Sequence, residues 1–217
     1  MTYTLVAGAA PLAGFDEFYS SLLSGAGTVV AADAAGEWCI ALGRTPDVVV
    51  GDFDSAAPGA AQRLRASGAE VVAFACDKDE TDLDLALGIA MARTVAPVVV
   101  TAAFSMRLDH TLAAFGSLVR AGGGASAREP GWRAWICTEE RGLDLDLAAG
   151  TTFSVLAIGE ARGVTITGAQ WPLDDAALAT LSGWGVSNRA SGGLVTVTTS
   201  SGTLVVMVQE EVPGTIY

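Results

Sequence analysis

The stretch Pro46-Asp-Val-Val-Val-Gly-Asp-Phe-Asp-Ser55 joins a short run of β-branched residues to a loop that carries two aspartates. Three consecutive valines favour a β-strand, because branched side chains pack well on a pleated surface. The residues that follow, from Gly51 to Ser55, are typical of a turn. The stretch therefore predicts a buried strand that ends in an acidic loop.

β-branched runs alternate with helical stretches on both sides of this segment. We expect strands at Tyr3–Val6, Thr28–Ala32, Asp47–Val50, Glu70–Ala75, Pro97–Thr101 and Arg133–Cys137. Good helix formers at helical spacing predict helices at Ala60–Ser67, Asp82–Arg93 and Asp109–Arg120. Strands that alternate with helices indicate a parallel, Rossmann-like sheet flanked by helices. The first two thirds of the chain should therefore form an α/β domain.

The pattern changes near residues 139–150, and the rest of the chain is rich in β-branched runs. Its expected strands are Phe153–Ile158, Val164–Thr167, Leu194–Thr199 and Leu204–Gln209. Gly and Ser turns separate these runs at intervals typical of hairpins, which favours an antiparallel sandwich or a small barrel. The glycine-rich segment 121–126 reads as a surface loop. We therefore expect an α/β domain at residues 1–139 and an all-β sandwich domain at residues 140–217.

Composition argues against several kinds of partner. The chain has 217 residues, 51% of them hydrophobic, and a formal net charge of −12 at pH 7. Nucleic acid and anionic bilayers repel an acidic surface, so we expect neither as a partner. No apolar run reaches the length of a membrane span, and the first residues do not resemble an export signal. The three cysteines lie in apolar stretches without metal-ligand spacing, which predicts buried thiols and a cytoplasmic location.

Acidic residues follow four of the expected strands. Asp33 follows the second strand, Asp52 and Asp54 follow the third, Asp82 comes after the fourth and Asp109 after the fifth. The carboxyl ends of parallel strands meet at one edge of a sheet, so these acids should face one ligand site. Clustered carboxylates repel one another unless a cation lies between them, and oxygen ligands favour Mg²⁺. The sequence therefore predicts a Mg²⁺ site.

Structural explanations compete with the functional ones at these positions. Asp82 stands at an expected helix start, where acids stabilise the helix. Arg107 can form a salt bridge to Asp109 or hold phosphate oxygens. Lys78 is either a phosphate ligand or a solvated loop residue. His110, in the first turn of an expected helix, needs no catalytic explanation.

Three segments together resemble the signature of the thiamine pyrophosphokinase family, in the family's order and spacing. They are Pro46–Ser55, Asp77-Lys-Asp-Glu-Thr-Asp82 and Arg107-Leu-Asp-His110. Two later segments, Gly168-Ala-Gln-Trp-Pro-Leu173 and Gly185-Val-Ser-Asn188, resemble the family's thiamine-side segments. The resemblance implies an enzyme that transfers pyrophosphate from ATP to thiamine, giving thiamine diphosphate and AMP. It also implies a homodimer with active sites where the two subunits meet.

The resemblance assigns roles to individual residues. The implied catalytic acids are Asp52, Asp54, Asp82 and Asp109, and the first three hold Mg²⁺. The implied ATP-binding residues are Asp33, Lys78, Asp79, Thr81 and Arg107. Thiamine is bound by Trp171, Ser187 and Asn188, with the indole ring against the cationic thiazolium. Without the resemblance, Trp171 is a core or interface aromatic.

Two other functions stay open. Side chains replace the family's glycines in Asp33-Ala-Ala-Gly36 and in Ala102-Ala-Phe-Ser-Met106, where the backbone should approach phosphates closely. A degenerate family member that binds thiamine or a nucleotide without turnover is therefore one alternative. The other is a haloacid-dehalogenase-like phosphatase, in which Asp52 of the strand-end Asp-x-Asp is the nucleophile.

Overall fold

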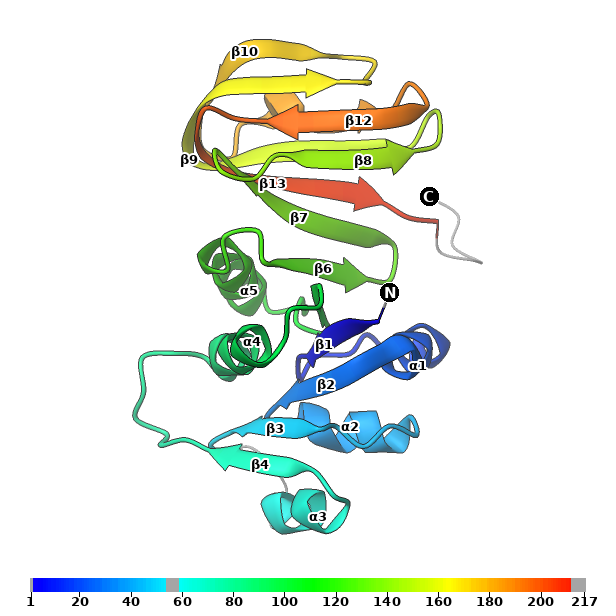
Figure 1. Cartoon of the computed structure of the whole chain (residues 1–217), viewed down its shortest axis with the longest axis vertical. Helices are drawn as coiled ribbons and strands as arrows, with labels where there is room; N and C mark the ends of the chain where they lie inside the picture. The colour runs from blue at the N-terminus through cyan, green and yellow to red at the C-terminus, as the bar shows by residue number, and fades with distance from the viewer. Residues whose placement is uncertain (1, 54–58, 212–217) are drawn as a thin grey trace. The chain divides into compact units, whose positions relative to one another are not determined.

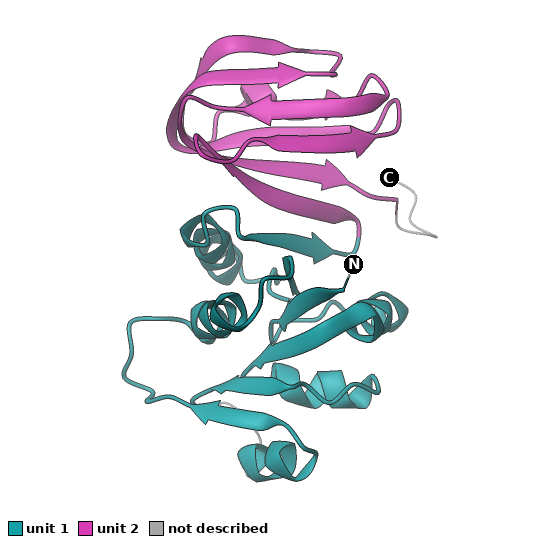
Figure 2. Ribbon diagram, in the orientation of Figure 1, with its two compact units in different colours: residues 1–130 teal, residues 131–217 magenta. Residues whose placement is uncertain are grey.

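The computed structural model describes residues 2–53 and 59–211, which form two compact units. The units divide the chain between Pro130 and Gly131 (Figures 1 and 2), whereas the boundary expected from the sequence lies after residue 139. Among the described helices, none has both the length and the apolar character needed to cross a bilayer.

The first unit contains a parallel sheet. Its described strands are β1 (Tyr3–Ala7), β2 (Ala26–Ala32), β3 (Val48–Gly51), β4 (Glu70–Ala73), β5 (Val98–Thr101) and β6 (Ala125–Glu129). They lie in the order β4-β3-β2-β1-β5-β6, and each neighbouring pair is parallel. Apolar runs such as β3, buried along its whole length, form such strands because helices cover both faces of a parallel sheet.

Helices connect these strands. They are α1 (Asp16–Gly25), α2 (Ala35–Ala41), α3 (Ala60–Ala66), α4 (Asp82–Arg93) and α5 (Leu108–Arg120). One face of the sheet packs against α1, α2 and α3 in a core that includes Leu5, Val29 and Leu64. Helix α4 packs against β1, β2 and β3 and lies beside α5 (Figure 1). The expected helix Asp82–Arg93 is confirmed, since α4 has these bounds.

The order of the strands reverses between β1 and β5. The chain first runs outward from β1 to β4, and α4 then brings it back so that β5 pairs with the other side of β1. Ligands of open parallel sheets bind at such a reversal, outside the carboxyl ends of the strands. Gly8 lets the two strand ends approach closely, because a Cβ atom there would lie 2.4 Å from the carbonyl oxygen of Ala102.

The second unit is built from antiparallel strands. They are β7 (Trp132–Thr138), β8 (Leu143–Leu147), β9 (Thr152–Thr167), β10 (Leu173–Leu178), β11 (Asn188–Arg189), β12 (Gly193–Thr198) and β13 (Ser201–Gln209), with a short 3₁₀ helix η1 (Gly183–Gly185). One sheet joins β7, β13, β9 and β11, and the other joins β8, β12, β9 and β10. Strand β9 therefore belongs to both sheets.

The separation of Phe153–Ile158 from Val164–Thr167 expected from the sequence is wrong, because both runs lie in β9. Residues 153–158 pair with β13, and residues 161–167 pair with β10 and β12, apart from Arg162, which pairs with Ser201 of β13. Gly159 and Gly163, which lie between the runs Phe153–Ile158 and Val164–Thr167, have φ angles of 79° and 62°. Glycine adopts this left-handed conformation without steric cost, so the strand changes sheets where the sequence indicated a turn.

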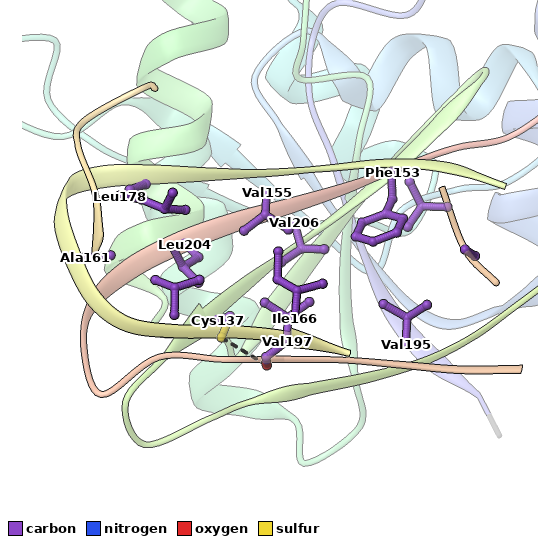
Figure 3. Packing of buried hydrophobic residues seen from close by; sticks show 14 of the residues in the cluster. Cys137, Phe153, Val155, Ala161, Ile166, Leu178, Val195, Val197, Leu204 and Val206 are labelled. Carbon is purple, nitrogen blue, oxygen red and sulfur yellow. Dashed lines mark hydrogen bonds between the residues drawn. The ribbon is translucent and has the colours of Figure 1, made fainter. Parts of the chain in front are cut away.

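The two sheets of the second unit share one hydrophobic core. Figure 3 shows Phe153 and Leu204 from one sheet packed with Ile166 and Val197 from the other. The Cys137 thiol donates a 3.5 Å hydrogen bond to the Val197 carbonyl inside this core (Figure 3). Alternating apolar residues on both sheets bury their side chains in this one layer.

The strand expected at Arg133–Cys137 exists, but its assignment to the parallel sheet is wrong. It is β7, which pairs antiparallel with β13 in the second unit. The last parallel strand is β6, whose first residues were expected to be part of a surface loop. Only Pro130 and Gly131 separate β6 from β7, and this is too short for the crossover that a further parallel strand needs.

The cysteines are buried at two of three positions. Cys39 and Cys137 are buried as expected, whereas Cys76 is exposed. Strand β4 ends at Ala73 and not at Ala75, so Cys76 lies in the loop that leads to α4. The expectation of a buried thiol is wrong there.

Candidate functional site

A cavity of about 830 Å³ lies in the first unit at the reversal of strand order. Its wall contains Gly8–Ala10 after β1, Asp33 after β2 and Ala102–Ala103 after β5. The first residues of α4 and α5 complete the wall. Backbone N–H groups at helix starts carry partial positive charge, so the cavity offers an environment for anions.

Most of the site residues predicted for the first unit lie at this cavity. The wall includes Asp33, Lys78, Thr81, Asp82, Arg107 and Asp109. Asp52 reaches the same place through its ion pair with Lys78. Asp79 is exposed and is not part of the wall, and Asp54 lies outside the described residues.

Lys78 lies between two of the predicted metal ligands. Its ammonium Nζ is 2.8 Å from Oδ1 of Asp82 and 3.3 Å from Oδ2 of Asp52. The side chains of Lys78 and Asp52 are only 14% and 12% exposed, so water screens this pair weakly. The hydrogen bond to Asp82, followed by that to Asp52, raises the pKa of Lys78. The lysine is thus a cation in the site and not a solvated loop residue.

The two carboxylates suit a divalent cation. Asp52 and Asp82 come from different loops, yet both direct an oxygen at one positive charge. Hard cations such as Mg²⁺ bind to one or two carboxylates together with substrate phosphates. Among the described residues, no three acidic, thiol or imidazole side chains form a ready metal cluster. The donor set therefore fits an ion that arrives with a phosphate ligand.

Asp33 is held at the carboxyl end of β2 by an unusual backbone conformation. Its φ angle is 46°, and its N–H donates a 2.7 Å hydrogen bond to the Val50 carbonyl. Gly51 makes this arrangement possible, because a Cβ atom there would lie 3.1 Å from Oδ1 of Asp33. Asp33 is 7% exposed, and the remaining surface faces the cavity.

Arg107 and Asp109 form the salt bridge that the sequence left open. Nη2 of Arg107 is 2.6 Å from Oδ2 of Asp109, and the side chains are 67% and 66% exposed. The hydrogen bond from Arg107 lowers the pKa of Asp109. Exposed ion pairs contribute little to stability, so a phosphate can compete for the guanidinium at low cost.

At the start of α4, Thr81 and Asp84 cap the helix, whereas Asp82 is directed toward Lys78. The Thr81 hydroxyl accepts a 3.1 Å hydrogen bond from the Asp84 N–H, and a carboxylate oxygen of Asp84 accepts one from the Thr81 N–H. Thr81 and Asp84 therefore form the capping box of the helix. Asp82 takes no part in it and points instead toward Lys78.

The two later motif segments, Gly168–Leu173 and Gly185–Asn188, lie side by side in the second unit. The Gln170 N–H donates a 2.8 Å hydrogen bond to the Arg189 carbonyl. Oδ1 of Asn188 accepts from the Trp171 N–H at 3.1 Å, and its Nδ2 donates to the Trp171 carbonyl at 2.7 Å. Asn188 is 4% exposed. Its amide therefore binds the backbone of Trp171 as a neighbouring strand would.

Trp171 itself is 55% exposed, so its interpretation as a core residue is wrong. Ser187 is also exposed, with a φ angle of 59° and an N–H that donates to Oγ of Ser154 at 3.1 Å. Ser187 precedes Asn188, whose amide binds the Trp171 backbone, and the exposed side chains of Trp171 and Ser187 are accessible to a ligand or a partner.

Sequence reasoning missed part of the cavity wall. The wall residues of the segment 102–106 lie where the sequence expected close approach to phosphates, whereas the residues it gave no role in binding are Gly8, Ala9, Ala10, Ala32, Cys76, Glu80, Leu83, His110, Ala113 and Ala114. Most of them contribute backbone or a small side chain, which leaves no pattern in a sequence. Their only available signal was their position directly after an expected strand or at the start of an expected helix.

Comparison with known proteins relates both units to one family. The family model described as thiamin pyrophosphokinase, catalytic domain, matches residues 19–127. The model described as thiamin pyrophosphokinase, vitamin B1 binding domain, matches residues 140–204. The chain belongs to the thiamin pyrophosphokinase family. No curated protein matches this chain.

Solved structures of thiamin pyrophosphokinases share the fold. The Bacillus subtilis protein superposes with a TM-score of 0.80 at 19% sequence identity, over 96% of this chain and 100% of its own. The Geobacillus thermodenitrificans protein gives 0.80 at 21%, over 97% of this chain and 98% of its own. The yeast protein superposes with a TM-score of 0.74 at 13% sequence identity, over 96% of this chain and 86% of its own. At these identities the likeness describes the fold alone.

Proposed function

We propose that this protein is a thiamine pyrophosphokinase that transfers the two distal phosphates of ATP to thiamine. The first domain binds the nucleotide, and the all-β domain binds thiamine. One observation carries the proposal: Asp52 and Asp82 both pair with the Lys78 ammonium. These residues lie beside the cavity at the reversal of strand order. Family membership supports it, since both family domains match in order.

In the proposed reaction, the hydroxyethyl oxygen of thiamine forms a bond to the β-phosphorus of ATP. The bond from this phosphorus to the bridging oxygen breaks, AMP leaves with that oxygen, and the hydroxyl proton is released. Bound Mg²⁺ supplies neutralisation of the charge on the phosphate oxygens. Positioning and charge stabilisation account for most of the catalysis in such transfers.

The residues of the first domain have distinct parts in this proposal. Asp52, Asp82 and, outside the described residues, Asp54 hold the metal ion. With a metal ion bound to these carboxylates, Lys78 would be available to pair with phosphate oxygens, as an ammonium does in many phosphate sites. Arg107 exchanges Asp109 for phosphate in the same way, and a planar guanidinium can bind two oxygens at once.

In the all-β domain, the Trp171 ring stacks against the cationic thiazolium. Cation–π attraction favours this arrangement most for tryptophan. The exposed indole and the hydrogen bonds that fix its backbone support the assignment. Ser187, whose side chain is exposed beside this segment, is assigned to the same surface.

The test is an incubation of the purified protein with Mg·ATP and thiamine, with and without EDTA. We expect thiamine diphosphate and AMP in equal amounts, and only without the chelator. ADP with thiamine monophosphate would identify a simple kinase instead. Nucleotide binding without release of AMP would identify a degenerate member, and a beryllofluoride adduct of Asp52, which mimics an aspartyl phosphate, would identify the phosphatase alternative.

We also propose that the protein is a homodimer whose active sites form where two subunits meet. Exposed apolar side chains on the all-β domain, including Leu181 and Trp184, support a covered surface. The test denatures an Asp82→Asn variant together with a Trp171→Ala variant, refolds the mixture, and assays it at a thiamine concentration far below the KM, where Trp171→Ala should be about tenfold less active than the wild type. If sites are shared, random pairing restores about a quarter of the wild-type sites. If each chain carries a complete site, the mixture gains no activity.

A further inference from the structure

A buried carboxylate lies behind the cavity, at the end of β6. Glu129 is 1% exposed and belongs to no motif. Burial raises its pKa to about 7, against the lowering effect of hydrogen bonds from backbone N–H groups and from Tyr19. Buried acids are costly unless their oxygens accept hydrogen bonds, so the partners of Glu129 indicate what it holds in place.

Its two oxygens have partners in different parts of the chain. Oε1 accepts a 3.2 Å hydrogen bond from the N–H of Ala103, in the loop after β5. Oε2 accepts a 3.1 Å hydrogen bond from the Tyr19 hydroxyl of α1. The oxygen of that hydroxyl accepts the N–H of Leu12, in the loop after β1, at 3.0 Å. Glu129 thus connects two loops that are far apart in sequence.

These two loops form the cavity wall at the reversal of strand order. Gly8, Ala9 and Ala10 line it from one side, and Ala102 and Ala103 from the other. They also bind each other, because the Ala10 N–H donates a 2.8 Å hydrogen bond to the Ala102 carbonyl. A change in either loop therefore changes the shape of the surface that faces the ligand.

The loop after β5 needs support, because its backbone is strained. Ala102 has a φ angle of 53°, a conformation that glycine adopts easily and alanine rarely. Ala102 is fully buried, so a change in its backbone conformation would also move the residues packed around it. The carboxylate acts directly after this residue, at the N–H of Ala103.

We propose that Glu129 is a positioning residue for nucleotide binding: its carboxylate holds the loops after β1 and β5 in the arrangement that accepts the nucleotide. The inference rests on the proposed use of ATP at this cavity. Glu129 touches neither substrate in this arrangement and acts through backbone groups. It takes over at Ala102 the conformational role that a glycine would otherwise have.

The experiment compares Glu129→Leu, Glu129→Gln and Tyr19→Phe in the full-length protein. Binding of a non-hydrolysable ATP analogue with Mg²⁺ is measured by calorimetry, and the KM values for ATP and thiamine are measured separately. We expect Glu129→Leu to weaken analogue binding roughly tenfold and to raise the KM for ATP equally. The KM for thiamine should stay within about twofold of the wild-type value.

The conservative variants keep the test meaningful if Glu129→Leu does not fold. Gln retains an acceptor for the Ala103 N–H, so Glu129→Gln should bind the analogue almost as the wild type does. Tyr19→Phe leaves that contact intact but removes the hydrogen bonds of the Tyr19 hydroxyl with Oε2 of Glu129 and with the Leu12 N–H, so we expect the affinity for the analogue to fall about threefold. Adding Ala102→Gly to Glu129→Leu should restore part of the affinity, because glycine removes the strain.

Unchanged analogue affinity in Glu129→Leu or, where that variant does not fold, in Tyr19→Phe would overturn the inference and leave Glu129 a stability residue. Equal increases in both KM values would do the same. A wild-type protein that binds the analogue but forms no thiamine diphosphate would overturn the proposed function alone. A wild-type protein that binds no analogue would overturn both.

Discussion

The two candidate sites of this protein are built on different physical principles. In the first unit, charged side chains on loops surround a cavity, and Asp52 and Asp82 are kept together by the charge of Lys78. In the second unit, an exposed indole is fixed by neutral hydrogen bonds between Asn188 and the backbone of Trp171. The first site depends on charge and the second on orientation.

This difference predicts different consequences of mutation. A carboxylate that binds a metal ion acts on the transition state, so its loss should lower kcat. An aromatic surface that binds the substrate in its ground state should mainly affect KM. Kinetic constants of single variants can therefore test the division of labour between the units.

The largest effect is expected at Asp82. Asp82→Asn should lower kcat about a thousandfold, because the variant removes the charge of a proposed metal ligand. The melting temperature should change little, since Asp82 takes no part in the capping box of α4. Glu70→Gln is the control, because Glu70 is the first residue of β4, at the amino end of the strand and away from the cavity. Its side chain forms an exposed ion pair with Arg93. A fall of Asp82→Asn activity no larger than that of the control would contradict the role.

The next effect is a pH dependence of stability from Glu129. Its pKa rises from 4.5 to about 7 on folding, so the folded chain binds more protons within this interval. Stability contributed by the protonated acid is complete below the lower value and is lost as the pH rises to the upper one. Glu129→Gln does not titrate, so its stability relative to the wild type should rise by roughly 3 kcal/mol over the interval. Urea unfolding across this pH range measures the difference, and parallel curves would disprove it.

At Trp171 we expect a smaller effect, confined to thiamine. Trp171→Ala should raise the KM for thiamine about tenfold, the magnitude of one cation–π contact, with the KM for ATP unchanged. The KM of Trp171→Phe for thiamine should lie between those of the wild type and Trp171→Ala. Leu194→Ala is a matched control, since Leu194 is 59% exposed in the same unit. Steady-state kinetics with thiamine as the varied substrate decide the matter, and equal effects of both alanine variants would argue against a specific stack.

The smallest effect is expected at Asn188. Asn188→Ala removes the two hydrogen bonds to Trp171 but leaves the ring in place, so the KM for thiamine should rise about threefold. Thermal unfolding should show a fall of a few degrees, as expected for about 1 kcal/mol in a chain of this size. An effect larger than that of Trp171→Ala would mean that Asn188 contacts thiamine directly.

The sequence predicted strands β1 to β5 and helices α3, α4 and α5 of the first unit, because buried parallel strands and amphipathic helices leave a strong signal, but it predicted no helix at α1 or α2. The valine run of β3 and the helix α4 are examples. It failed at β6 and β7, where pairing depends on chain connections that hydrophobicity does not encode. It also divided β9 at Gly159 and Gly163, since a glycine that bends a strand looks like one that ends it.

The candidate site was predictable where function requires charged side chains. Asp33, Asp82 and Arg107 lie at the cavity as the motifs implied. The sequence assigned Asn188 to thiamine but did not reveal its hydrogen bonds to the Trp171 backbone, and it gave Glu129 no role, because contacts with backbone groups leave no pattern in a sequence. A structure was needed to show that Asn188 holds Trp171.

The shared strand β9 has a consequence for how the second unit unfolds. Its first half is hydrogen-bonded in one sheet and its second half in the other, so neither sheet can separate while the other stays whole. Amide protons on β12 and β13 should therefore exchange with solvent through one common opening event and at similar rates. Pairing between segments distant in sequence also makes folding slow, so this unit should set the pace of refolding.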